Sequence, residues 1–333
     1  MQREPGNRMR AAVHERYGPP SVMRIAEVAR PEPGPRDLLV KVHASTMNRS
    51  DCGFRAAKPF IVRPFSGLLR PRHPVSGTEF SGVVAAIGRE VTEFAEGDAV
   101  FGRLQDERPG AHAEYLLIPA SGAVAHKPSN LSHEQAAAIC DGAMMAAMYL
   151  RQVDLARHPR ILVNGASGAI GSAAVQLAKA RGALVTAVCK TESIEIVRAL
   201  GADRIVDYRR EDFTATDAVH DIVLDVVPTS SFGRCRRLLR EGGYYLSAEL
   251  GPWCQNPLLA LWTPLARSRV QVRFPIPFYR KWEASALKDL AEAGRFTPVI
   301  DRVYPLDEIV AAAEYVETGE KIGNVVISVT VDA

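Results

Sequence analysis

The sequence predicts a two-domain α/β protein in which a doubly wound parallel sheet is inserted within a barrel-like β domain. The 333 residues exceed what one core usually fills, since single cores stop growing near ~250–300 residues. Short β-rich runs separated by Gly and Pro fill the first third, and strands alternate with helices after that. We expect residues 1–130 and 297–333 to form one domain and residues 131–296 the other.

The β domain is predicted from runs of alternating or continuous apolar residues. These runs are Leu38–Val42, Gly82–Ile87, Asp98–Phe101 and Ala113–Ile118. Two later runs, at 298–303 and 324–329, resemble the first domain more than the segment before them. The second domain is therefore expected to be an insertion.

The second domain is predicted to begin with a helix at Ser132, because Gln135 stands three residues later in a capping-box pattern. Strands then alternate with helices, as in a parallel doubly wound sheet. The expected strands are Ile161–Val163, Leu184–Val188, Arg204–Val206, Asp221–Asp225 and Tyr244–Leu246.

Composition excludes several classes of protein. The net charge is +3, and the 41 basic residues are interspersed with 38 acidic ones, so nucleic acid is not an expected partner. The five cysteines are odd in number and dispersed, which favours a reducing compartment over a disulfide framework. Residues 1–10 are polar and no apolar run reaches ~20 residues, so we expect a cytoplasmic protein without stable membrane association.

A glycine-rich turn follows the strand Ile161–Val163 and leads directly into a helix. Its residues are Gly165, Ala166, Ser167, Gly168, Ala169, Ile170 and Gly171. Glycines let the backbone approach a pyrophosphate, and the helix N-terminus supplies free N–H groups and partial positive charge. The context of strand, turn and helix predicts a dinucleotide site here.

The choice of cofactor depends on the end of the next strand. NAD enzymes place an acidic residue there to accept hydrogen bonds from the ribose hydroxyls. This chain has Lys190, which cannot accept a hydrogen bond but can pair with the extra phosphate of NADP. NADPH is therefore the expected cofactor, and the nearby Glu192 leaves NAD open as an alternative.

Several motifs recur in order along the chain and together resemble one family. They are Asn48-Arg49-Ser50-Asp51, Gly77-Thr78-Glu79-Phe80, Gly97-Asp98-Ala99-Val100, the glycine turn, Leu200-Gly201-Ala202-Asp203 and Gly323-Asn324-Val325. The chain resembles the medium-chain dehydrogenases/reductases, specifically the quinone oxidoreductase-like branch that lacks zinc. The resemblance implies a GroES-like β domain, a Rossmann domain and a cleft that holds the nicotinamide.

The resemblance also implies roles for single residues. Lys190 and Tyr208 match the pair that holds the 2′-phosphate of NADPH, Asn48 matches the asparagine beside the nicotinamide ribose, and Asp51 matches a cleft aspartate. The remaining implied cofactor contacts are Asp225, Val226, Ser247, Phe274 and Asn324. A homodimer is expected through the edge strand Val270–Phe274.

No metal is expected. Zinc enzymes of this superfamily carry Cys and His where this chain has Asn48 and Thr78, and a Cys or an acid near Asp141. One carboxylate cannot assemble the usual three-ligand site. Glu79, near zinc in those enzymes, is expected here to be a buried carboxylate paired with an arginine such as Arg49.

Without a Lewis acid, alcohol oxidation is disfavoured and reduction of an electron-poor acceptor is favoured. We therefore expect an NADPH-dependent reductase of a quinone or an activated double bond, with Asn48 and Asp51 as catalytic residues. Asn48 and backbone N–H groups are the candidate donors to the acceptor oxygen. A hydrophobic substrate is expected, and the residues expected to wall its pocket are Phe60, Met144, Trp253 and Trp262.

Two alternative functions and the role of two apolar segments stay open. Phe60 stands where some relatives place a tyrosine hydroxyl, so the chain could be an NADPH-binding sensor or interaction protein with little turnover. It could instead be an alcohol or aldehyde dehydrogenase. The apolar segments Phe60–Leu69 and Trp253–Phe278 could wall the pocket, cover a dimer surface or touch a membrane lightly.

Overall fold

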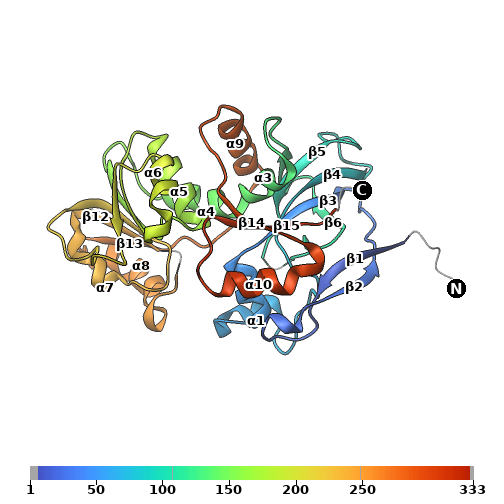
Figure 1. Cartoon of the computed structure of the whole chain (residues 1–333), viewed down its shortest axis with the longest axis horizontal. Helices are drawn as coiled ribbons and strands as arrows, with labels where there is room; N and C mark the ends of the chain where they lie inside the picture. Colours follow the sequence, from blue (N-terminus) through green and yellow to red (C-terminus); the bar gives the residue numbers. More distant parts are fainter. Residues whose placement is uncertain (1–6, 107, 248, 331–333) are drawn as a thin grey trace. The chain divides into compact units, whose positions relative to one another are not determined.

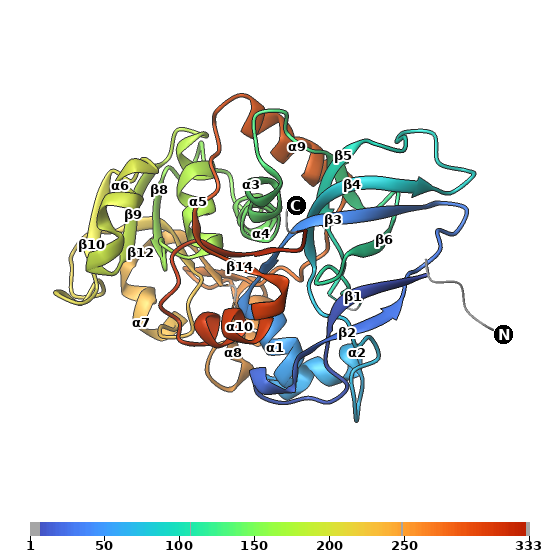
Figure 2. The ribbon, with the colours of Figure 1, turned by 45° about the vertical axis from the view of Figure 1, so that its right-hand side comes forward.

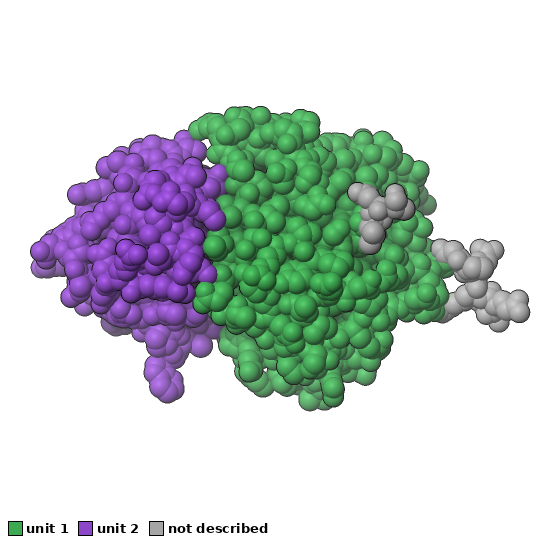
Figure 3. All heavy atoms as spheres, viewed as in Figure 1, with its two compact units in different colours: residues 1–141, 278–333 green, residues 142–277 purple. Residues whose placement is uncertain are grey.

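The computed structural model describes residues 7–106, 108–247 and 249–330. The chain forms two compact units (Figure 3): residues 1–141 with 278–333, and residues 142–277. The second unit is thus inserted within the first. Six residues at the start and three at the end of the expected first domain lie outside the described residues.

The unit bounds differ from the expected insertion at 131–296. Helix α3 (His133–Ala138) packs against strands β3 and β4 of the first unit, and helix α9 (Lys281–Glu292) packs against β7. Both helices therefore belong to the first unit. The predicted start of α3 is correct, since Ser132 Oγ accepts from the N–H of Gln135 at 3.2 Å and Gln135 Oε1 accepts from the N–H of Ser132 at 3.0 Å.

The second unit contains the predicted doubly wound sheet (Figure 1). Its six strands are parallel and lie in the order β10-β9-β8-β11-β12-β13. Their bounds are β8 Arg160–Asn164, β9 Leu184–Cys189, β10 Arg204–Asp207, β11 His220–Asp225, β12 Leu239–Ser247 and β13 Gln271–Arg273. The direction of the chain across the sheet reverses between β8 and β11, which is where such folds bind their ligands.

Helices follow these strands in sequence and pack against them (Figure 2). Helices α5 and α6 contact β8, β9 and β10, while α7 and α8 contact β12 and β13 respectively. The helix bounds are α4 Cys140–Leu150, α5 Ala169–Lys179, α6 Ile194–Ala199, α7 Phe232–Cys235 and α8 Gln255–Leu265. The central strands are buried on both faces, which explains why they appear in the sequence as continuous apolar runs.

The first unit is built on a seven-stranded sheet in the order β14-β15-β3-β4-β5-β7, with β6 on β3. All pairs are antiparallel except β14 with β15. Strand bounds are β3 Asp37–Met47, β4 Glu79–Ile87, β5 Ala99–Arg103, β6 Tyr115–Pro119, β7 Ala123–His126, β14 Ile300–Pro305 and β15 Asn324–Ser328; β1 (Arg8–Val13) and β2 (Arg24–Ala29) form a separate hairpin. The remaining helices are α1 Arg49–Ala56, α2 Arg63–Ser66 and α10 Ile309–Glu317.

The long strand β3 positions the site of the first unit. Leu38, Val40 and Val42 are fully buried in the main core of this unit. At the far end of β3 the chain turns at Asn48 into helix α1. No helix among the described residues is long and apolar enough to cross a membrane.

Candidate cofactor and active site

The predicted cofactor residues of the second unit gather at one edge of its sheet. Parallel pairing places Asn164 beside Val188 and Asp225, and Asp225 beside Ser247. Lys190, Tyr208 and Phe274 follow the ends of β9, β10 and β13. Residues predicted from distant parts of the sequence thus lie along the carboxyl edge, where open α/β sheets bind ligands.

The glycine turn has the backbone that close approach of a phosphate requires. Gly165 adopts φ +88°, which side-chain-bearing residues rarely adopt. A Cβ on Gly171 would overlap the carbonyl oxygen of Gly165, so this glycine lets α5 pack tightly against the turn. A Cβ on Gly168, the N-cap of α5, would meet only the Gly165 oxygen at 3.5 Å. The space in front of Gly168 is therefore open at the N-terminus of an eleven-residue helix.

Lys190 and Tyr208 stand side by side at the ends of paired strands. Cys189 pairs with Asp207, and the N–H of Tyr208 donates to the Cys189 carbonyl at 3.1 Å. Lys190 is buried, whereas Tyr208 is about half exposed. These positions fit a subsite for an anion next to an exposed aromatic ring.

Two further cations lie at this subsite and were missed in the sequence analysis. Arg209 bonds to Glu192 at 2.9 Å, and Arg210 approaches Asp207 at 3.3 Å. Asp207 also accepts from the Thr191 hydroxyl at 2.6 Å. The signal was present in the sequence, since both arginines follow Tyr208 directly.

Both carboxylate oxygens of Asp225 accept hydrogen bonds within the second unit, so neither is free to accept one from a ligand. Asp225 is 1% exposed, and its two oxygens accept hydrogen bonds from Asn164 Nδ2 at 2.9 Å and from the Tyr245 hydroxyl at 2.7 Å. Burial raises the pKa of Asp225, and these two donors oppose the shift. A cofactor bound here would therefore contact the backbone or Val226, which is less buried than Asp225.

Asn48 in the first unit is held by three neighbours. Its side-chain N–H₂ donates to Thr46 Oγ1 at 3.1 Å and to Glu79 Oε1, and its backbone N–H donates to Asp51 Oδ2 at 2.8 Å. Both amide hydrogens are thus used within the protein. The amide oxygen is better suited than the N–H₂ group to meet a ligand, which weakens the expected role as oxyanion donor.

Asn324 lies beside Asn48 because Val325 of β15 pairs with Met47 of β3. Asn324 is 3% exposed and its Nδ2 donates to the Val299 carbonyl at 3.1 Å. Its Oδ1 is buried without a hydrogen-bond partner in the protein. A donor from a bound ligand would satisfy this oxygen.

The acids around Asn48 favour their protonated forms. Burial raises the pKa of Asp51 to about 7, and burial together with Asp141 raises the pKa of Glu79 well above its ordinary value. The expected pairing of Glu79 with Arg49 is wrong: within the described part of the chain no ion pair joins them, and Glu79 accepts from Asn48 instead. Arg49 is exposed, whereas Glu79 is buried.

Arg103 is the buried cation of this region, and the sequence analysis missed it. It is 1% exposed and bonds to Asp141 at 3.0 Å and Asp106 at 2.8 Å. Its guanidinium also lies 3.7 Å from the ring centre of Tyr279. Nearby, desolvation lowers the pKa of Lys321 to about 8, so this amine holds its proton less firmly than an exposed lysine.

Comparison with known proteins agrees with this arrangement. The alcohol dehydrogenase GroES-like domain family matches residues 34–129, and the zinc-binding dehydrogenase family matches residues 200–327. The human NAD(P)H oxidoreductase RTN4IP1, mitochondrial, is 30% identical over 96% of this chain and 89% of its own length. The structure of the quinone oxidoreductase from Coxiella burnetii has a TM-score of 0.85 at 27% identity, over 97% of this chain and 100% of that one. The chain is an oxidoreductase of the medium-chain dehydrogenase/reductase superfamily, in its quinone oxidoreductase-like branch.

A plant protein is similar to this oxidoreductase at the same level. The chloroplastic NADPH-dependent alkenal/one oxidoreductase of Arabidopsis thaliana is 30% identical over 96% of this chain and 79% of its own length. The human relative is described as mitochondrial and the Arabidopsis relative as chloroplastic.

The donor set of this oxidoreductase does not fit zinc. The positions of two zinc ligands in the metal-dependent enzymes hold Asn48 and Thr78, which bind Zn²⁺ poorly. Among the described residues, no group of three or more His, Cys, Asp or Glu side chains is placed to hold a metal ion.

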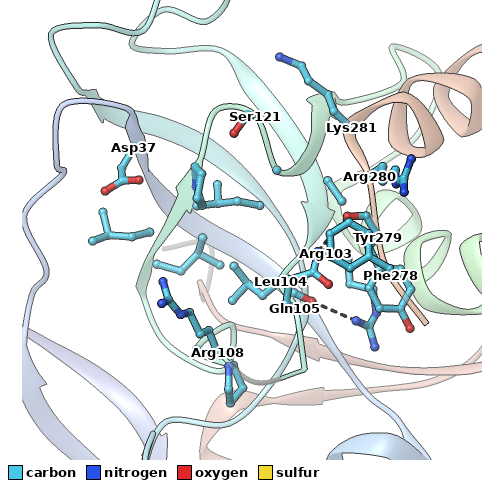
Figure 4. Close-up of a pocket in the computed structure, with 18 of the residues that line it drawn as sticks. Asp37, Arg103, Leu104, Gln105, Arg108, Ser121, Phe278, Tyr279, Arg280 and Lys281 are labelled. Atoms are coloured by element: carbon cyan, nitrogen blue, oxygen red, sulfur yellow. Dashed lines mark hydrogen bonds between the residues drawn. The ribbon is translucent and has the colours of Figure 1, made fainter. Parts of the chain in front are cut away.

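A groove of the first unit is drawn in Figure 4, and its lining residues include neither Asn48 nor Asp51. It encloses about 1430 Å³ beside β6 and α9, and Leu104, Arg108 and Lys281 are among its lining residues. Gln105 Nε2 bridges to the Tyr279 carbonyl at 2.8 Å within it. Because neither candidate catalytic residue lines this groove, its size alone does not make it the active site.

The four side chains expected to wall the substrate pocket differ in exposure. Met144 is buried at 1% exposure, whereas Phe60, Trp253 and Trp262 are 70%, 97% and 65% exposed. None of the four lines the groove of the first unit. Their role as pocket walls stays a prediction.

Proposed function

We propose that this oxidoreductase uses NADPH to reduce hydrophobic quinones or α,β-unsaturated carbonyl compounds without a metal. The observation that carries the proposal is the position of the open glycine turn and of Lys190. They follow the adjacent strands β8 and β9 at the carboxyl edge of the Rossmann sheet. It is supported by relatives whose names describe NAD(P)H, alkenal/one and quinone oxidoreductases.

The second unit would hold the cofactor by its phosphates. The turn at Gly165–Gly171 offers backbone N–H groups and the N-terminus of α5 to the pyrophosphate. Lys190 and Tyr208 would hold the 2′-phosphate, with Arg209 and Arg210 adding positive charge.

In the first unit, the candidates for contact with a nicotinamide ribose are Asn48 and Asn324. Asn48 and Asn324 lie next to each other at the joined ends of β3 and β15. The unpaired Asn324 Oδ1 can accept a hydrogen bond from a ribose hydroxyl. The bound cofactor supplies the hydride, and the chain supplies orientation and a proton.

The acceptor class follows from what these residues can and cannot stabilise. Because the donor set around Asn48 does not fit zinc, it does not provide the Lewis acid that alkoxide formation needs. A quinone or an enone is already electrophilic and needs only orientation and a modest contact to its oxygen. Asp51, whose pKa is raised to about 7, is partly protonated at neutral pH and is therefore a candidate proton donor.

We also propose a homodimer that forms through strand β13. This strand lies at the edge of the six-stranded sheet, so one side of its backbone has no neighbouring strand within the described chain. The expected cytoplasmic location stays a prediction.

The test is steady-state oxidation of NADPH with naphthoquinones, enones and aldehydes, beside reduction of NADP⁺ with alcohols, each with and without added zinc. We expect turnover of quinones or enones that zinc does not change, and no oxidation of ethanol. Rapid zinc-dependent alcohol oxidation with no turnover of any quinone or enone would contradict the proposal.

A further inference from the structure

A small cavity lies beside Asp51 within the first unit. Its volume is about 20 Å³, and its lining includes His14, Ser50, Thr78 and Asp106. A cavity of this size holds one water molecule, provided that two to four polar groups face it.

The polar groups are present and have no partner within the protein. His14 Nδ1, Ser50 Oγ and Thr78 Oγ1 are buried and make no hydrogen bond. His14 and Thr78 are each 5% exposed. Leaving three such atoms unpaired is costly, and a single water in the cavity could bond to several of them.

The His14 ring is neutral at neutral pH and can therefore hydrogen-bond to a water molecule. Burial and the nearby Arg55 lower the pKa of His14 to about 4. At neutral pH the ring therefore carries one proton and one lone pair, so it can donate to or accept from a water according to its tautomer.

Thr78 lies in the wall of this cavity. The hydroxyl of Thr78 is left pointing into a buried region without a partner.

Asp51 connects this cavity to the candidate active site. It lines the cavity, is 7% exposed, and accepts a hydrogen bond from the backbone N–H of Asn48 at 2.8 Å. The charged groups that act on it are Arg103, which favours its ionised form, and Asp106 and Asp141, which oppose ionisation. Burial is the largest effect, and it favours the acid form.

We propose that the cavity holds one water bonded to Thr78 and His14, and that Asp51 with this water supplies the proton that completes acceptor reduction. The inference rests on the proposed function. The hydride gives the acceptor its electron pair and leaves an anion. The O–H bond of Asp51 then breaks as a new O–H or C–H bond forms on the acceptor. The water returns a proton to the Asp51 carboxylate and regains one from solvent, so each turnover takes up one proton.

In this scheme Asp51 is the proton donor, whereas Thr78 and His14 are positioning residues that hold the water. Removing the hydroxyl of Thr78 should therefore slow proton delivery without weakening NADPH binding. General acid catalysis contributes about 10²- to 10⁴-fold, and losing one of the water's partners should cost on the order of tenfold in kcat.

The experiment compares wild type, Thr78→Val and Thr78→Ser with an enone acceptor, and measures kcat, KM, the solvent deuterium isotope effect and the Kd for NADPH. We expect Thr78→Val to lower kcat about tenfold and raise the isotope effect, with KM and Kd unchanged, and Thr78→Ser to restore both. Thr214→Val is the matched control, because Thr214 is also a buried threonine, its hydroxyl is already bonded to Asp212 at 2.8 Å, and it does not line the cavity. It should lower thermal stability and leave the isotope effect unchanged.

Two outcomes would overturn the inference while leaving the proposed function intact. One is normal enone turnover by Thr78→Val with an unchanged isotope effect. The other is a high-resolution crystal structure with no water in the cavity, a measurement that stands even if a variant fails to fold. Failure of the proposed function would instead appear as absence of any acceptor turnover by the wild type.

Discussion

Replacing Asp51 with asparagine should stabilise the protein above neutral pH. Burial raises the pKa of Asp51 from 3.8 to about 7, so between these values the folded chain holds a proton that the unfolded chain has released. The free energy of unfolding therefore falls as pH rises through this window, and the stability is fully present only below about pH 4. A shift of about three units at 1.36 kcal/mol per unit amounts to about 4 kcal/mol. An asparagine side chain cannot ionise, which removes this cost, and its oxygen can still accept from the N–H of Asn48.

The assay is urea unfolding followed by far-ultraviolet circular dichroism at pH 4.5 and pH 8. Asp51→Asn should exceed wild type by up to about 4 kcal/mol at pH 8 and by much less at pH 4.5. Titrating groups that do not interact with Asp51 cancel in the difference, whereas Glu79 does not cancel fully, because Asp51 contributes to its raised pKa. The control is Asp289→Asn, at an exposed position on α9, which should show no such pH-dependent gain. A difference between Asp51→Asn and wild type that is the same at both pH values would refute the reasoning.

Three further predictions concern the cofactor and assembly. Lys190→Ala should reduce the preference for NADPH over NADH by about 10-fold or more, because a charge-assisted phosphate contact contributes about 1.5–3 kcal/mol. The preference is measured as the ratio of the Kd values for the two cofactors. An unchanged ratio would show that Lys190 does not contact the 2′-phosphate. Gly168→Ala should bind NADPH more weakly without a change in melting temperature, whereas Gly171→Ala should lower the melting temperature because its Cβ overlaps the turn. Scanning calorimetry measures the melting temperatures, and titration calorimetry measures the Kd for NADPH. Equal melting temperatures of the two variants would contradict this packing. Light scattering should return the mass of a dimer, and a monomer mass near 36 kDa at micromolar concentration would remove the proposed assembly through β13.

The fold could be predicted because its signals are local. Strands buried on both faces appear as short apolar runs, and the glycine turn has a backbone that only glycine adopts freely at Gly165. The capping box of Ser132 was also correct. Local signals do not say which sheet a helix packs against, which is why α3 and α9 were expected in the wrong unit.

The grouping of the cofactor residues at the carboxyl edge of the sheet could be predicted from the sequence. The cluster of Asp51, Glu79 and Asp141 around Arg103 could not. Residues after successive parallel strands must share one edge, so Lys190 and Tyr208 could be placed together from sequence. Burial of Arg103 and the bond between Asn48 and Glu79 depend on contacts between residues about 30 or more positions apart. The cavity beside Asp51 is a property of packing and has no sequence signal at all.

The central claim is that this chain transfers a hydride from NADPH to an activated acceptor without a metal. The most direct measurement is single-turnover stopped flow of the NADPH-loaded, chelator-treated protein mixed with a naphthoquinone or an enone, followed by loss of nicotinamide absorbance. We expect complete oxidation of the bound NADPH, at a rate that is lowered when deuterium replaces the transferred hydrogen. Persistence of bound NADPH against every quinone and enone, together with alcohol-driven reduction of NADP⁺ that appears only after zinc is restored, would contradict it.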